Sequence, residues 1–179
     1  MGSLDKLETS LDEMFDKKAP VKIPADGRKG LAHALWWIAL VVGLLQLWSA
    51  ITLWQWGHAT DNLINAVNYY TGGVYVRHLG MFYYLSLLSM ATVAVLMLLA
   101  SPQLKAMKKG GWDLLFYGVI VEAVAAVLQL FTSGAGFVNF FASAVGTVIG
   151  AFLLFQVREH FIMSHPADHK AAETKKPKE

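Results

Sequence analysis

Residues 31–56 read LAHALWWIALVVGLLQLWSAITLWQW and contain no Asp, Glu, Lys or Arg. A bilayer core about 30 Å thick is crossed by about 20 helical residues, so this stretch is long enough and apolar enough to span a membrane. Residues 79–100, LGMFYYLSLLSMATVAVLMLLA, also lack charge. Between Asp113 and Arg158 the sequence holds one charged residue, Glu122, and this interval is long enough for two more spans.

The third interval divides at residues 132–136, TSGAG, because small polar residues and glycine interrupt helices. We therefore predict spans at 31–56, 79–100, 112–131 and 137–157. A soluble helical bundle would keep a charged stripe on every helix, and these segments have none. The alternation typical of a membrane barrel is also missing. The predicted fold is an all-α membrane protein whose transmembrane domain, residues 31–157, is a four-helix bundle.

The composition agrees with this class and excludes several chemistries. The 179 residues are 55% hydrophobic and 16% charged, against about 45–50% and about 25% in typical soluble domains. Without cysteine there is no disulfide framework, thiol catalysis or cysteine-based metal site. No phosphate-binding loop or nucleophile motif occurs. We expect a non-enzymatic protein without cofactor or metal.

The basic residues predict the topology, since Lys and Arg accumulate on the cytoplasmic side. Of the 15 Lys and Arg residues, Arg77 alone lies in the segments between spans one and two and between spans three and four. The others lie before the first span, between spans two and three, or after the fourth. We expect the chain to lie in the inner membrane of a cell, with both termini in the cytoplasm. Because these basic residues flank spans, they do not indicate nucleic-acid binding.

The segments outside the spans are polar. Within residues 1–18, apolar side chains recur every three or four residues, which predicts a cytoplasmic amphipathic helix: Leu4, Leu7, Leu11 and Phe15. Acidic residues outnumber basic ones on its other faces, so docking to a partner or a second copy competes with binding to the bilayer surface. Residues 19–30 contain Pro20, Pro24 and Gly27 and predict a linker. Residues 158–179 predict a disordered tail.

The segment between the first two spans, residues 57–78, predicts an outer loop with a short surface helix in DNLINAVNYY, 61–70. Tryptophans near predicted span ends are typical of an interfacial belt: Trp36, Trp37, Trp54, Trp56 and Trp112. Trp48 lies deeper and predicts a packing residue.

Helix packing alone does not account for Glu122, because this residue places an ionisable carboxyl inside an apolar span. It lies ten residues into the third predicted span, where a charge costs about 2.5–3.5 kcal/mol on insertion scales. Gln129 shares its helix face, and Gln46 in the first span is placed to reach across. One interpretation is a carboxyl that couples proton movement to transport. The other is a protonated carboxyl that holds helices together by hydrogen bonds, at about 0.6–2 kcal/mol per contact.

The fourth span carries small residues at a spacing of four, Ala142, Gly146 and Gly150, which lets two helix backbones approach closely. The partner is either the third span or a second copy in a homodimer.

The histidines do not indicate a site. His33, His58, His78 and His160 lie near span ends, whereas haem ligation needs histidines well inside facing spans. His165 and His169 have a metal-binding spacing, but Pro166 and the polar tail favour a solvated segment.

Two functions follow from the sequence. The first is a structural, accessory or assembly subunit that acts through helix contacts with the bilayer and a membrane-protein partner or second copy. The second is a small proton-coupled transporter that uses Glu122.

Overall fold

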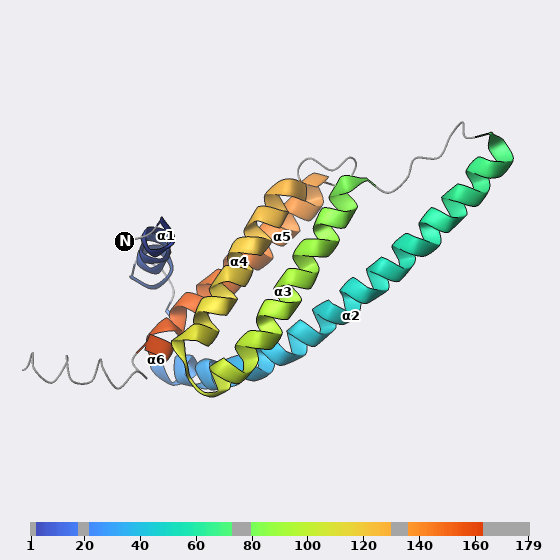
Figure 1. Cartoon of the computed structure of the whole chain (residues 1–179). Coiled ribbons are helices and arrows are strands. Elements are labelled where there is room, and N and C mark those ends of the chain that lie inside the picture. The colour runs from blue at the N-terminus through green and yellow to red at the C-terminus, as the bar shows by residue number, and fades with distance from the viewer. Residues whose placement is uncertain (1–2, 18–21, 73–79, 130–135, 163–179) are drawn as a thin grey trace, which may run out of the picture.

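The computed structural model describes residues 3–17, 22–72, 80–129 and 136–162, and this part of the chain is helical and contains no strand (Figure 1). The predicted all-α class is confirmed. The elements in chain order are α1 (Ser3–Asp12), the π-helical turn η1 (Glu13–Lys17), α2 (Ala25–Thr71), α3 (Met81–Lys105), α4 (Lys109–Gln129), α5 (Gly136–Gln156) and α6 (Arg158–Ile162).

Three helices, α2, α3 and α4, are long and apolar enough to cross a membrane by length and composition. Another apolar helix, Phe140–Gln156, is shorter in the part whose side chains are described. The long helices pack in sequence order, α2 on α3, α3 on α4 and α4 on α5 (Figure 1). In the described residues α2 and α5 share at most marginal contact, so the row of helices stays open between its first and last members.

Small residues let α2 approach α3 closely. The buried positions of α2 follow a spacing of mostly seven residues: Ala32, Ala39, Gly43, Ala50, Gly57 and Ile64. A Cβ on Gly43 would come within 3.1–3.2 Å of Met97 and Leu98, and one on Gly57 would overlap the ring of Tyr83. Such small-residue seams allow helices without a hydrophobic driving force to pack by backbone proximity. The sequence prediction overlooked this seam.

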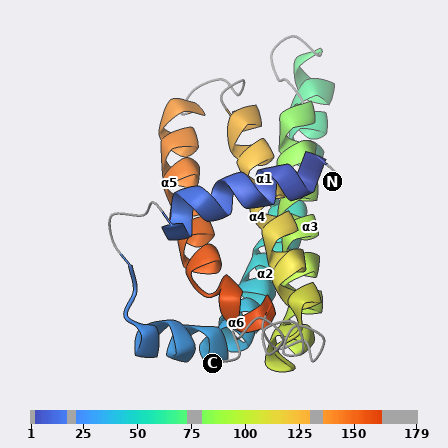
Figure 2. The same cartoon turned by 90° about the vertical axis from the view of Figure 1, so that its left-hand side faces the viewer.

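The buried hydrophobic cluster lies toward one end of the bundle, called here the base, where α6, the first turns of α2 and the α3–α4 turn meet (Figure 2). There Trp112 stacks on Phe116 and Phe155 packs edge-on against both rings, with ring centroids 5.3–5.8 Å apart. Trp112 is 0% exposed and its Nε1 donates to the carbonyl of Leu154 at 2.9 Å. Its predicted place in an aromatic belt is therefore wrong, because its indole caps the carboxyl end of α5.

Two other tryptophan expectations have different outcomes. Trp48, predicted to pack, is 72% exposed, because it points away from the side of α2 that carries the small residues. Trp37, Trp54 and Trp56 are exposed as a belt requires.

Helix α2 is much longer than the predicted span 31–56. It begins at Ala25, so residues 25–30 are helix and the predicted linker is wrong there; Pro24 is the N-cap, where its missing N–H costs nothing. It also continues through Gly57, so the outer loop predicted from residue 57 is wrong as far as Thr71. The helix predicted at 61–70 is confirmed as helix, but it is part of α2 and not a separate element. Gly57 serves packing rather than a turn. The helix ends at Gly72, whose φ of 69° is the left-handed conformation that glycine adopts readily.

The remaining boundaries are closer to prediction. Helix α3 continues past Ala100 to Lys105 despite Pro102 in its last turn, and a tight turn with Met107 at φ 52° connects it to α4. Residues 158–162, predicted as the start of a disordered tail, form α6. The interhelical break predicted at 132–136 lies outside the described residues up to 135, as does the tail from 163.

Candidate functional site

Glu122 lies on α4 in the middle of the bundle, where its side chain is partly buried. The side-chain amide of Gln46, on α2, donates a hydrogen bond to its carboxyl group. These two residues are 76 positions apart in the sequence, and the stacking of α2, α3 and α4 brings them together. The structure thus joins two of the three polar side chains that the sequence singled out. The third, Gln129, ends α4, and its side chain lies outside the described residues.

A cavity of about 360 Å³ opens beside this pair, on the side away from the base. We call it the polar cavity. All four long helices contribute to its wall: Gln46, Leu53, Ser86, Ser89, Met90, Val93, Glu122, Ala125, Ser143, Gly146 and Thr147. Four hydroxyl groups, one amide and one carboxyl therefore meet in a space surrounded by apolar helices.

A second cavity of about 240 Å³, the apolar cavity, lies on the base side of Glu122. Its wall is apolar apart from that carboxyl: Leu31, Leu35, Ile38, Ala39, Val42, Met97, Leu115, Gly118, Val119, Glu122, Gly150, Leu153 and Leu154. Among the described residues, Glu122 alone lines both cavities. The carboxyl therefore stands between a polar compartment and an apolar one.

The small residues of α5 lie on these walls. Gly146 lines the polar cavity and Gly150 lines the apolar cavity. A Cβ added to either glycine would meet no atom within 4 Å, so no described helix of the chain packs closely there. Ala142 is exposed. Close packing of this seam on the third predicted span is therefore absent from the structure, and the small side chains instead leave space beside Glu122.

The apolar stripe of α1 and η1 faces the chain's own helices. Leu7, Leu11 and Phe15 line an apolar groove of about 570 Å³ with α4 and α5, and Figure 2 shows α1 lying across these helices. The ring of Phe15 stacks on Phe155 at 6.0 Å, and its carbonyl accepts a hydrogen bond from Gln156 at 2.8 Å. The side chain of Leu4 lies outside the described residues.

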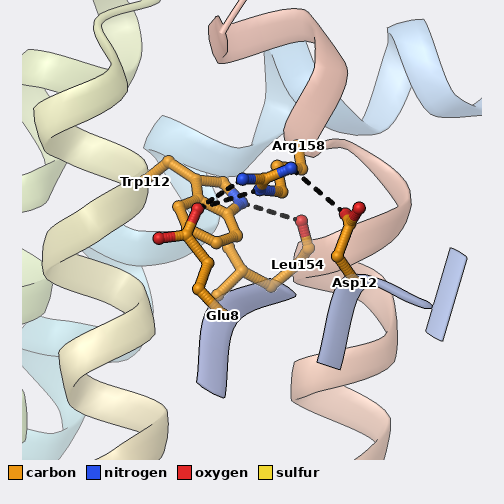
Figure 3. Close-up of polar contacts among 5 residues, drawn as sticks. All are labelled: Glu8, Asp12, Trp112, Leu154 and Arg158. Atoms are coloured by element: carbon orange, nitrogen blue, oxygen red, sulfur yellow. Dashed lines mark hydrogen bonds and ion pairs between the residues drawn. The ribbon is translucent and has the colours of Figure 1, made fainter. Parts of the chain in front are cut away.

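Arg158 fixes this arrangement (Figure 3). Its Nη1 contacts Asp12 Oδ1 at 3.2 Å, its Nε contacts Glu8 Oε1 at 3.1 Å, and its guanidinium lies 5.4 Å from the ring centroid of Trp112. The acidic residues that made membrane-surface binding less favourable are thus partners of a cation on α6. An ion pair between residues about 150 positions apart leaves no local pattern in the sequence, so the sequence prediction missed the contacts that Arg158 makes with α1.

Two of the described histidines contact neighbours within their own helix. His33 contacts the carbonyl of Lys29 in its own helix, and His58 packs edge-on against Trp54. Within residues 3–17, 22–72, 80–129 and 136–162 no group of three or more His, Cys, Asp or Glu side chains is placed to hold a metal. His165 and His169 lie outside these ranges.

Comparison with protein-family models, curated proteins and solved structures finds no match to this chain.

Proposed function

We propose that this chain is a small multi-pass membrane protein that transports a small solute in exchange for, or together with, a proton carried by Glu122. In this proposal α2, α3, α4 and α5 each cross the bilayer and both termini face the cytoplasm. The length and apolarity of α2, α3 and α4, and the 21-residue length of α5, support the spans. The distribution of Lys and Arg supports the orientation.

The observation that carries the proposal is that Glu122 lines two cavities on opposite sides of it. A carrier needs a binding group reached from each side of the membrane in turn. Ionisable residues inside spans characteristically face a cavity and serve proton or substrate pathways. A purely structural carboxyl would be enclosed by side chains, whereas Glu122 accepts a hydrogen bond from Gln46 and borders a cavity on each side.

Proton flux in vesicles tests the proposal. The purified protein is reconstituted into liposomes that contain a pH-sensitive dye, and outward gradients of small amines, carboxylates and neutral solutes are applied separately. We expect one chemical class to drive proton movement through the wild-type protein. Glu122→Gln abolishes this movement, and Glu159→Gln, the same change at an exposed position of α6, leaves it intact. Proton movement equal to that in protein-free vesicles, or retained by Glu122→Gln, contradicts the proposal.

The accessory-subunit function is the second candidate. Its supports in the sequence are the N-terminal stripe and the small residues of α5. The stripe faces α4 and α5 of its own chain, which leaves the outer side of α5, with Phe141, Val145 and Ile149 exposed, as the surface for a partner. Purification in mild detergent followed by mass spectrometry tests it, since an accessory subunit co-purifies with a stoichiometric partner.

A further inference from the structure

The polar cavity offers more hydrogen-bond acceptors than donors. The hydroxyl of Ser89 donates to the carbonyl of Ser86 at 2.8 Å, and the hydroxyl of Thr147 donates to the carbonyl of Ser143 at 2.9 Å. A hydroxyl has a single hydrogen but two lone pairs. Because both hydrogens are engaged within their own helices, these oxygens are left as acceptors for a ligand.

The side chains of Gln46 and Glu122 add further hydrogen-bond acceptors. Gln46 donates from its side-chain nitrogen to Glu122, which leaves the Gln46 carbonyl oxygen as an acceptor. An ionised carboxylate is acceptor-only, and the Met90 thioether is a weak acceptor. No Lys, Arg or His lines either cavity in the described part of the chain. An anion would therefore meet a carboxylate without any compensating cation.

Size and shape narrow the class of ligand. The polar cavity, at about 360 Å³, falls within the range of about 300–1,000 Å³ typical of small-molecule sites. It is larger than a bare metal ion requires, and a single carboxyl is a poor ligand set for one. Leu53, Val93 and Ala125 supply apolar wall beside the acceptors. The cavity thus suits an organic cation with a short apolar portion.

We propose that the polar cavity binds a small organic cation bearing N–H donors, a primary ammonium or a guanidinium, with its charge against Glu122. This inference rests on the proposed function, because it names the solute whose binding competes with the proton. When the carboxyl of Glu122 is protonated, binding of one cation displaces that one proton to solvent and leaves the carboxylate paired with the cation, so charge and atoms balance. The N–H groups donate to Glu122, to the Gln46 carbonyl oxygen and to the hydroxyl oxygens of Ser89 and Thr147.

Because the cation and the proton compete for Glu122, the affinity for the cation depends on pH. Glu122 is the sole titratable side chain lining either cavity, whether from α2, α3, α4 or α5, among the described residues. Affinity for the cation therefore falls as pH falls and Glu122 takes up its proton.

Isothermal titration of the full-length protein in non-ionic detergent tests this inference. The probes are propylammonium, guanidinium, tetramethylammonium, butyrate and 1-propanol. We expect the two N–H cations to bind at least about tenfold more tightly than tetramethylammonium, which has the charge but no donor. Glu122→Gln lowers their affinity at least about tenfold. Glu159→Gln leaves it unchanged, and titration in buffers of different ionisation heat shows release of one proton.

The outcomes separate this inference from the proposed function. Tighter binding of butyrate or 1-propanol, or equal binding of tetramethylammonium, overturns the inference even where proton flux depends on Glu122. Conversely, selective binding of the N–H cations without proton flux in vesicles supports the inference and overturns transport. A Glu122→Asp variant guards against misfolding, since it retains the carboxyl and is expected to retain the preference for N–H cations.

Discussion

Arg158 joins segments that lie 150 residues apart in the sequence, because its guanidinium contacts Glu8 of α1 and lies against the ring of Trp112 at the base (Figure 3). Its side chain is 23% exposed and those of its acidic partners are 17% exposed, so water screens the charges only in part. Removing one member leaves the others poorly solvated, at a cost of about 1–3 kcal/mol.

We expect Arg158→Ala to release α1 from α4 and α5. Backbone amides of residues 3–17 then exchange hydrogen faster, and the melting temperature falls, because the ion pairs and the cation–π contact with Trp112 are lost. Hydrogen-exchange mass spectrometry measures the first effect and thermal unfolding the second. Glu159→Ala, on the exposed side of α6, is the control. Unchanged exchange in residues 3–17 would show that the apolar contacts of Leu11 and Phe15 hold the segment without the charges.

At the scale of helices, glycines on α2 and α5 have opposite surroundings. Gly43 abuts Met97 and Leu98, whereas Gly146 borders the polar cavity with no atom within 4 Å of an added Cβ. The same substitution therefore has different consequences on the two helices.

We expect Gly146→Leu to fold with near-normal stability and to lose ligand binding and proton flux, because the new side chain fills the polar cavity. Gly43→Leu forces α2 away from α3 and costs about 1–3 kcal/mol or more of stability. Thermal unfolding and size-exclusion chromatography compare the two variants. Dissociation of Gly146→Leu from dimer to monomer would instead assign the α5 seam to a homodimer, and a lower melting temperature would indicate close packing inside the bundle.

The helices differ in how closely the sequence predicts their bounds. The apolar stretches predicted α3, α4 and α5 to within a few residues, because the absence of charge is a property of the chain itself. The extent of α2 was missed, because the polar residues that follow Trp56 predict an outer loop over 57–78. Thr60 instead bonds to the carbonyl of Trp56 in its own helix at 2.8 Å, and Gly57 accommodates Tyr83. Whether a glycine serves a turn or a contact depends on a neighbour 26 residues away.

The residues of the candidate site also differ in whether the sequence predicts them. Glu122 and Gln46 stood out because polar residues are costly in apolar spans. The hydroxyls of Ser86, Ser89 and Thr147 did not, since such residues are common in helices and bond back to their own backbone. Their convergence follows from the stacking order of four helices, which no local pattern encodes.

At the scale of the whole molecule, packing is uneven. Buried aromatic side chains gather at the base, and the cavities lie between α2 and α5, which have little contact with each other. An open row of helices can change its spacing with less loss of contact than a closed bundle. Such a design suits a protein in which two cavities exchange access.

The proposed orientation is tested on the whole chain. A reporter that is active only outside the cytoplasm gives no signal when fused after residue 179 and a signal when fused after Gly72. The reason is that an even number of spans returns the chain to its starting side. A reporter active only in the cytoplasm gives the reverse pattern. A signal from the external reporter at the C-terminus would contradict both the four-span count and the positive-inside assignment.

The uninterrupted length of α2 has a mechanical consequence. At 1.5 Å per residue its 47 residues extend about 70 Å, more than twice the thickness of a bilayer core of about 30 Å. The same rod that carries Gln46 beside Glu122 ends in a far segment where Tyr69 and Tyr70 are 84% and 83% exposed. Because α2 is one continuous helix, Tyr70 lies about 36 Å along the same rod from Gln46. A partner that held those tyrosines would hold the helix that lines the polar cavity, at a point well outside that cavity.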